Sequence, residues 1–186
     1  MKILFILLIS AFSNPSYADP VSDLVERLKG TDEKYEIVGT ICEQAARIEL
    51  EREFQPPRYQ IETGISYGNN SKTIGEIDVV IFDSDKKVAL VAEVKCWKDL
   101  NGALQKARSQ RKRFKDTISS GSKVKFWDDD KDQHSYGQFT AIQYFDSISQ
   151  KGGKAAGFDR ELELSLEQLM EARRRLLSCN SGGSCE

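Results

Sequence analysis

Histidine is almost absent from this sequence, which has only His134 among its 186 residues. The four cysteines include no Cys-x-x-Cys pair, so the ligand spacing of common zinc sites is missing. A mechanism that needs a catalytic histidine would depend on His134 alone, and a lone histidine in an acidic loop is more typical of a surface residue. These two shortages argue against a zinc protein and against a histidine-dependent enzyme.

Long apolar segments are also missing beyond the first residues. The apolar run at residues 3–9 follows a short basic start, and it is too short to span a bilayer. Small residues at Ser16 and Ala18 then complete the pattern of a secretory signal peptide. No cysteine follows the run, so we expect no lipid anchor. We also expect no stable membrane anchor after the signal peptide is cleaved. The prediction is a signal peptide at 1–18 and one secreted or periplasmic domain at 19–186.

The sequence also has no excess of basic residues. Lysine and arginine total 27 against 29 acidic residues, which gives a formal net charge of −2. This balance excludes a strongly basic protein of the kind that coats nucleic acid, so any such binding must come from a local patch. We find no internal repeat and no low-complexity block.

The four cysteines of an exported chain are expected to form disulfides, because disulfides persist in an oxidising environment. Cys179 and Cys185 flank a flexible stretch and could close a small ring. Cys42 and Cys96 would then form the second pair and join a helix to a strand. The spacing alone leaves all three pairings of four cysteines open.

The periodicity of apolar residues predicts an α/β domain with a mixed β-sheet flanked by helices. The strand at 88–95 is apolar throughout, which predicts a central position covered on both faces. The glycine-rich residues 151–157 are expected to be irregular. A short helix that ends at Gly30 is predicted within residues 20–34, and further helices at 35–54, at 102–117 and after a capping box at 165–168. Strands are predicted at 58–67, 74–82, 88–95, 124–127 and 139–145.

Three charged residues interrupt the two most apolar strands. Glu93 and Lys95 share a face, because strand side chains alternate. A hairpin with a four-residue loop places Asp83 opposite Val88, and counting back places Asp78 opposite Glu93. Directly opposed residues lie about 5 Å apart on one face. A shift of one residue would send Asp78 to the other face, so the prediction depends on register.

Two carboxylates so close together repel and raise each other's pKa, and a bound hard cation removes that penalty. Oxygen ligands favour Mg²⁺, with Mn²⁺ as an alternative. Lys95 could then hold or activate a water molecule, or neutralise charge on a phosphate. The alternative is a salt bridge on a solvated sheet face, but such a face seldom has so many apolar neighbours.

The segments GEIDVVIFD and VALVAEVKCW resemble the PD-(D/E)xK superfamily of phosphodiesterases, which places an acid on one strand and acid-x-Lys on the next. Asp78, Glu93 and Lys95 match this pattern, while Ile77 stands where the family name has proline. The resemblance implies a restriction-endonuclease-like core and Mg²⁺-dependent hydrolysis of nucleic acid, of DNA more than of RNA. It implies Asp78 and Glu93 as metal ligands and Lys95 as a catalytic residue.

The same resemblance implies further residues on the neighbouring helices. Family members often have a glutamate on the helix before the sheet, and Glu43 is the candidate, with Glu36, Glu49 and Glu51 as competitors. Some members have a glutamine on the helix after the lysine, and Gln110 is similar.

That second helix is strongly basic, so Gln110, Arg108, Arg111 and Lys112 are candidate nucleic-acid contacts. The alternative is a solvated charged face. Two other functions stay open: a catalytically inactive exported protein that binds nucleic acid or assists assembly, and an antibacterial toxin with an immunity protein as partner.

Overall fold

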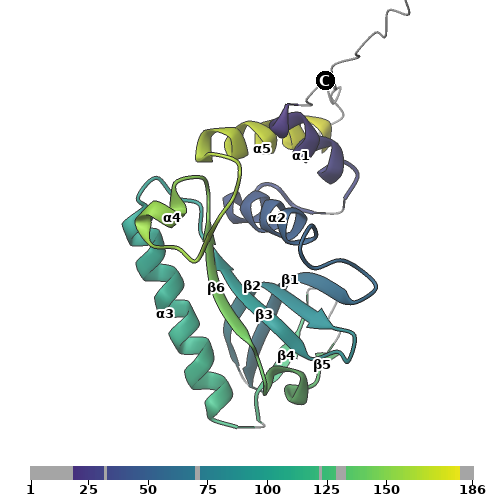
Figure 1. The fold of residues 1–186 in the computed structure, drawn as a ribbon, viewed down its shortest axis with the longest axis vertical. Coiled ribbons are helices and arrows are strands. Elements are labelled where there is room, and N and C mark those ends of the chain that lie inside the picture. The colour runs from purple at the N-terminus through teal and green to yellow at the C-terminus, as the bar shows by residue number, and fades with distance from the viewer. Residues whose placement is uncertain (1–18, 32, 70–71, 122, 129–132, 181–186) are drawn as a thin grey trace, which may run out of the picture.

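The computed structural model describes residues 19–31, 33–69, 72–121, 123–128 and 133–180. Within them, seven strands form one sheet in the order β5-β4-β1-β2-β3-β6-β7 (Figure 1). The pairs β3–β6 and β6–β7 are parallel and the other pairs are antiparallel, which confirms the predicted α/β class with a mixed sheet. The strands are β1 (Tyr59–Asn69), β2 (Lys72–Asp83), β3 (Val88–Val94), β4 (Lys125–Trp127), β5 (Gln133–His134), β6 (Tyr144–Ser149) and β7 (Arg160–Glu161).

Helices cover both faces of the sheet. On one face α2 contacts the strands and the pair α1 and α5 lies over α2, whereas α3 runs along the other face (Figure 1). Side chains cap the starts of α1, α3 and α5. At α5 this is the predicted box of Ser165 and Gln168, which donate their backbone N–H groups to each other's side chains. The helices are α1 (Pro20–Leu28), α2 (Val38–Leu50), α3 (Leu100–Ser119), α4 (Gly153–Ala156) and α5 (Leu166–Asn180), with a 3₁₀ turn at Tyr136–Phe139.

Strand β3 lies between β2 and β6, and all of its residues are buried. Its valine, leucine and alanine side chains have apolar neighbours on both faces, as is typical of an apolar strand in the middle of a sheet. The predicted central position is therefore confirmed. Any charged residue in this strand is held in an apolar environment.

The alternation of side chains along β2 is broken at Asp78. Val79 packs in the cluster beneath α2, and Val80 packs in the cluster beneath α3. Ile77 also packs in the cluster beneath α3. Ile77 and Val79 are two residues apart on the strand, and such residues normally share a face. Gly64 lies opposite this point on β1 and has a φ of +72°, a conformation that side chains disfavour. Asp78 is therefore the residue at which the side chains of β2 change from one face of the sheet to the other.

The strand predicted at residues 139–145 is wrong. Phe139 ends the 3₁₀ turn and stacks on Phe126 at 3.8 Å, and strand β6 occupies Tyr144–Ser149 instead. The true strand ends in buried serines that resemble a loop in sequence. The structure satisfies their hydroxyls, because Ser147 donates to Asp159 and Ser149 donates to the carbonyl of Lys95.

The expectation for residues 151–157 is also corrected. These residues form the short helix α4, which Gly152 and Gly157 bracket with positive φ values. Strand β7 was not predicted, because two residues give no periodic signal. Helix α2 begins at Val38, later than the predicted start at residue 35.

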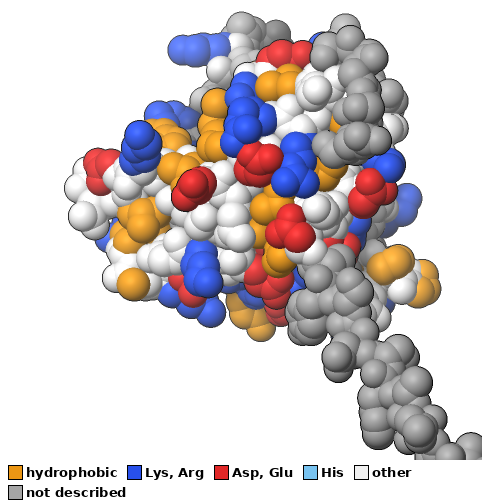
Figure 2. All heavy atoms as spheres, turned by 90° about the horizontal axis from the view of Figure 1, so that it is seen from above, with side chains coloured by type: hydrophobic (Ala, Val, Ile, Leu, Met, Phe, Trp, Pro, Cys, Tyr) orange, Lys and Arg blue, Asp and Glu red, His pale blue; other side chains and the backbone are white. Residues whose placement is uncertain are grey.

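Among the described residues, no helix is both long and apolar enough to cross a bilayer. The predicted signal peptide lies outside the described residues. Figure 2 looks onto the molecule from the side of α1 and α5, and its described side chains of both charges are mixed with apolar ones. This face therefore offers no broad basic surface among those residues, and a nucleic-acid contact has to be sought elsewhere.

Candidate metal and catalytic site

The site forms where β2 and β3 part. Their ladder ends with the pair Val79 and Ala92, and the next residue of β2 in the same register is Asp78. The backbone N–H of Val94 donates to Oδ2 of Asp78 at 2.7 Å. A side-chain carboxylate thus replaces the backbone acceptor that a continued ladder would provide, and it fixes Asp78 beside the end of β3.

The structure brings the three predicted residues together. Nζ of Lys95 lies 2.5 Å from Oδ2 of Asp78 and 3.5 Å from Oε2 of Glu93. It also donates to the carbonyl of Val94 at 3.0 Å. Asp78 and Glu93 are only 5% and 4% exposed. One ammonium therefore faces two buried carboxylates, which leaves an excess of negative charge in a poorly solvated place.

Glu93 has the less satisfied of the two carboxylates. Its Oε2 atom is buried, and Nζ of Lys95, 3.5 Å away, does not reach it in good hydrogen-bond geometry. Burial, together with the charge of Asp78, raises the pKa of Glu93 to about 8, although Lys95 and Arg113 oppose the shift. A buried oxygen without a donor is costly, and a cation would relieve that cost.

Glu43 reaches this site from α2. Burial and the carboxylates of Asp78 and Glu76 together raise the pKa of Glu43 to about 8, although the charge of Lys95 opposes the shift. Among the described residues, Glu43, Asp78 and Glu93 do not all place an oxygen within 4.8 Å of one another. Asp78 and Glu93, which both contact Lys95, form the inner pair, and Glu43 belongs to the edge of the site.

The competitors of Glu43 have other surroundings. Glu36 is exposed at the surface. Glu49 accepts a hydrogen bond from the backbone of Glu163 at 2.9 Å. Glu51 forms ion pairs with two arginines, one from α1 and one from its own helix. None of these contacts involves Asp78, Glu93 or Lys95, so the structure favours Glu43 as the helix glutamate of the site.

A disulfide fixes α2 against the end of β3. Cys42 and Cys96 are bonded, with Cα atoms 6.3 Å apart, which confirms this predicted pair. Cys42 precedes Glu43 and Cys96 follows Lys95, so the bond ties together the two segments that supply site residues. Cys179 is also disulfide-bonded, and its predicted partner Cys185 lies outside the described residues.

Helix α3 contributes residues from the other face. Oε1 of Gln110 is buried without a hydrogen-bond partner among the described atoms. Nε of Arg113, about one turn later, lies 3.5 Å from the hydroxyl of the buried Tyr67. Arg113 also acts on Glu93, since it is one of the charges that lower the pKa of that carboxyl. The sequence places Arg113 among the basic residues of this helix but does not single it out as a site residue, although its spacing from Gln110 is that of one helical turn.

The other basic residues of α3 lie differently. Arg111 donates to the carbonyl of Phe145 at 2.6 Å and pairs with Asp159, so it ties α3 to neighbouring elements. Arg108 lies beside Gly157, at the end of α4. Lys112 is exposed and pairs with an acid one turn away. By their spacing, Arg108, Arg111 and Lys112 lie along one side of the helix, and Gln110 lies on the other side.

The raised pKa values predict a pH-dependent stability in the absence of divalent metal. Glu43 and Glu93 have an ordinary pKa of 4.5 and a folded-state pKa of about 8. Between these values the folded protein binds more protons than the unfolded chain, so the free energy of unfolding falls as pH rises. We expect the melting temperature in EDTA to fall by several degrees between pH 5 and pH 9, since about 1 kcal/mol corresponds to roughly 2–4 °C.

Circular dichroism melts across this pH range measure the effect. Glu93→Gln and Glu43→Gln should each flatten the pH dependence, because a neutral amide has no proton to lose. Glu26→Gln, on the exposed side of α1, is the matched control and should keep the wild-type slope. Equal slopes in all four proteins would contradict the assignment of these two carboxyls.

No protein-family model, curated protein or solved structure matches this chain significantly. Any functional assignment therefore has to be argued from the site.

Proposed function

We propose that this chain is an exported, metal-dependent nuclease that hydrolyses phosphodiester bonds in nucleic acid, with DNA as the preferred substrate. The observation that supports it most is the convergence of Asp78, Glu93 and Lys95 at the parting strands, with both carboxylates buried. A structural salt bridge would need one acid for one lysine. Here a second acid is buried beside the pair, and its one ion-pair contact among the described residues is the long one of 3.5 Å to the same lysine.

The donor set fits a hard divalent cation. Asp78 and Glu93 offer carboxylate oxygens, which Mg²⁺ and Mn²⁺ prefer, and Glu43 adds a third carboxyl at the edge. Such a cation would offset the burial and the repulsion by Asp78 that together raise the pKa of Glu93. When bound, it supplies Lewis-acid stabilisation of the charge that develops on a phosphate.

Lys95 has a different role from the two proposed metal ligands. Lys95 has an ammonium between the two carboxylates, where it can orient a water molecule and neutralise negative charge on the phosphate. Burial lowers the pKa of Lys95, but the charge and hydrogen bond of Asp78, together with the charges of Glu93 and Glu43, outweigh it and raise the pKa, so this side chain stays charged. Water adds to phosphorus, the bond to the leaving oxygen breaks, and the products are a phosphate monoester and a free hydroxyl.

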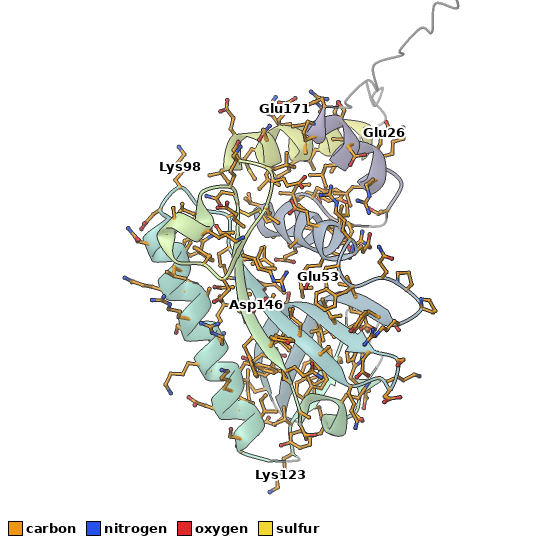
Figure 3. All side chains as sticks on the ribbon, in the orientation of Figure 1. Glu26, Glu53, Lys98, Lys123, Asp146 and Glu171 are labelled. Carbon is orange, nitrogen blue, oxygen red and sulfur yellow. A yellow bond between two sulfur atoms is a disulfide. The ribbon has the colours of Figure 1, made fainter. Side chains whose placement is uncertain are left out.

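Digestion of plasmid DNA and of RNA with Mg²⁺, Mn²⁺ or EDTA tests the proposal directly. Cleavage should require the metal, and Asp78→Asn and Glu93→Gln should each lose it. Glu26→Gln serves as a control, since Glu26 lies on α1, away from the strands that form the site (Figure 3). Cleavage that persists in EDTA, or in both site variants, would overturn the proposal.

One observation favours a second function, that of an inactive exported binding or assembly protein. Oδ2 of Asp78 already accepts hydrogen bonds from Val94 and from Lys95, so this oxygen is satisfied without a cation. Titration calorimetry with Mn²⁺ separates the two functions. A nuclease should bind Mn²⁺ through Asp78 and Glu93, whereas an inactive fold would show no binding that Asp78→Asn removes.

Arg113 is expected to bind a phosphate of the substrate. It is exposed, lies on α3 and is close enough to influence Glu93. Replacing Arg113 by alanine should weaken DNA binding about equally for all sequences and reduce the salt dependence of binding by about one charge. Fluorescence anisotropy with a labelled duplex measures both quantities in Ca²⁺ buffer.

Lys112→Ala is the matched control for Arg113→Ala. Lys112 precedes Arg113 on the same helix, is exposed and forms its ion pair with Asp116. We expect its loss to change the affinity less than the loss of Arg113. Equal effects would mean that α3 acts through its overall charge and that Arg113 has no special position.

A further inference from the structure

A second cluster of metal-ligating side chains lies on the other side of β2 from Glu93 and Lys95. Glu62 on β1, Asp128 after β4 and His134 on β5 each offer a ligand atom, and these atoms all lie within 4.8 Å of one another. The strands that bring them together are neighbours in the sheet, in the order β5-β4-β1. Among the described residues, this is the one group of three that meets the distance.

His134 is built into this cluster and is not the surface residue that the sequence predicts. Its side chain is only 12% exposed. The ring stacks on Phe82, with centroids 5.2 Å apart and planes at 9°, and meets Phe139 edge-on at 6.4 Å. Aromatic packing therefore fixes the direction of the imidazole.

The imidazole directs a buried nitrogen at the acids. Nε2 of His134 lies 3.2 Å from Oε2 of Glu62, yet it is buried and has no partner of hydrogen-bond geometry among the described atoms. Gln60 donates to the other oxygen, Oε1 of Glu62, at 2.8 Å. That hydrogen bond orients the carboxylate, as supporting groups do around metal ligands.

The ligand types select the ion. One imidazole nitrogen with two carboxylates suits Zn²⁺ and related transition metals, whereas Mg²⁺ and Ca²⁺ prefer oxygen ligands alone. Ligand atoms about 2 Å from Zn²⁺ lie roughly 3.3 Å apart, so small side-chain rotations would close the cluster. We propose that Glu62, Asp128 and His134 bind one Zn²⁺-class ion, which ties β1, β4 and β5 together at this edge of the sheet. This site is separate from the proposed nuclease chemistry.

The single histidine of the chain makes the test direct. In the ¹⁵N-labelled full-length protein, the imidazole signals of His134 should shift on titration with one equivalent of Zn²⁺ and not with equal Mg²⁺. Zn²⁺ at a hundredfold excess over its Kd should raise the melting temperature by roughly 5–10 °C. His134→Gln and Asp128→Asn should lose that rise, while Glu26→Gln keeps it.

The outcomes separate this proposal from the nuclease proposal. Imidazole signals unmoved by Zn²⁺ would overturn the second metal site, whatever the DNA-cleavage result. A Zn²⁺-induced rise in melting temperature that survives Asp128→Asn would do the same. If His134→Gln does not fold, Asp128→Asn and the imidazole signals of the wild type still decide, because neither depends on that variant.

Discussion

Replacing Lys95 by alanine is expected to reduce Mg²⁺-dependent cleavage of plasmid DNA by about 10²–10³-fold, the usual cost of losing one charged donor at a reacting phosphate or oxyanion. Metal binding should survive, and it should become tighter, because the ammonium 2.5 Å from Oδ2 of Asp78 no longer competes for that oxygen. Loss of cleavage with retained Mn²⁺ binding would assign Lys95 to the chemical step. Gel assays of initial rates and Mn²⁺ calorimetry measure the two effects.

Stability has to be followed in the same variant. Removing Lys95 leaves Asp78 and Glu93 buried without their ammonium, and breaking a buried pair costs about 3–5 kcal/mol when the remaining charge is uncompensated. Protonation of Glu93 limits this cost, since the pKa of its carboxyl is already about 8 with the lysine present. We therefore expect a folded protein with a lower melting temperature and an unchanged circular dichroism spectrum.

Lys98→Ala is the control for the lost lysine. Lys98 lies close in sequence, is exposed, and extends away from the protein body (Figure 3). Its loss should leave the cleavage rate unchanged. If Lys95→Ala cleaves within about twofold of the wild type, Lys95 has no catalytic role. If it neither cleaves nor binds Mn²⁺, the lysine acts by holding the two carboxylates in place.

The convergence of the site residues could be predicted from local rules, although one detail of the prediction was wrong. The predicted hairpin places Asp83 opposite Val88, whereas the structure pairs Phe82 with Val88. The turn is tighter, because the N–H of Asp83 donates to the carbonyl of Lys87. The ladder then shifts by one residue at Ala89, which restores the predicted register at the site. Strand alternation and an apolar environment on both faces were enough to group the three residues.

The surroundings of the site could not be predicted in the same way. Arg113 and His134 obtain their roles from neighbours far along the chain, Tyr67 and Phe82, which no local period brings together. The change of face at Asp78 likewise depends on Gly64 in the adjacent strand. Local sequence patterns report burial and periodicity, and they do not report which distant aromatic ring covers a given side chain.

The restriction-endonuclease-like core remains a prediction, and the mixed sheet is consistent with it at the level of fold class. Fold alone would not assign the chemistry, because one fold supports many functions. The assignment depends on the buried carboxylates at the strand ends, and so on the tests of Asp78, Glu93 and Lys95.

Removing the disulfide between Cys42 and Cys96 is the second change with a large expected effect. The bond closes a loop with a sequence separation of 54, and the loss of such a bond costs about 2–5 kcal/mol. The double variant Cys42→Ala/Cys96→Ala should therefore melt roughly 5–15 °C lower, as measured by denaturant and thermal unfolding. Cys179→Ala, on α5, is the control, and its smaller loop should cost less.

The effect on cleavage should exceed the effect of stability alone. The disulfide holds α2, which supplies Glu43, against the segment that supplies Lys95, and a displacement of about 1 Å among catalytic groups can cost about 10²-fold in rate. Assayed well below its melting temperature, the double variant should still lose most of its cleavage, while Cys179→Ala keeps it. Full activity in the folded double variant would show that the disulfide stabilises the fold without positioning the site, and that Glu43 is not needed in a fixed place.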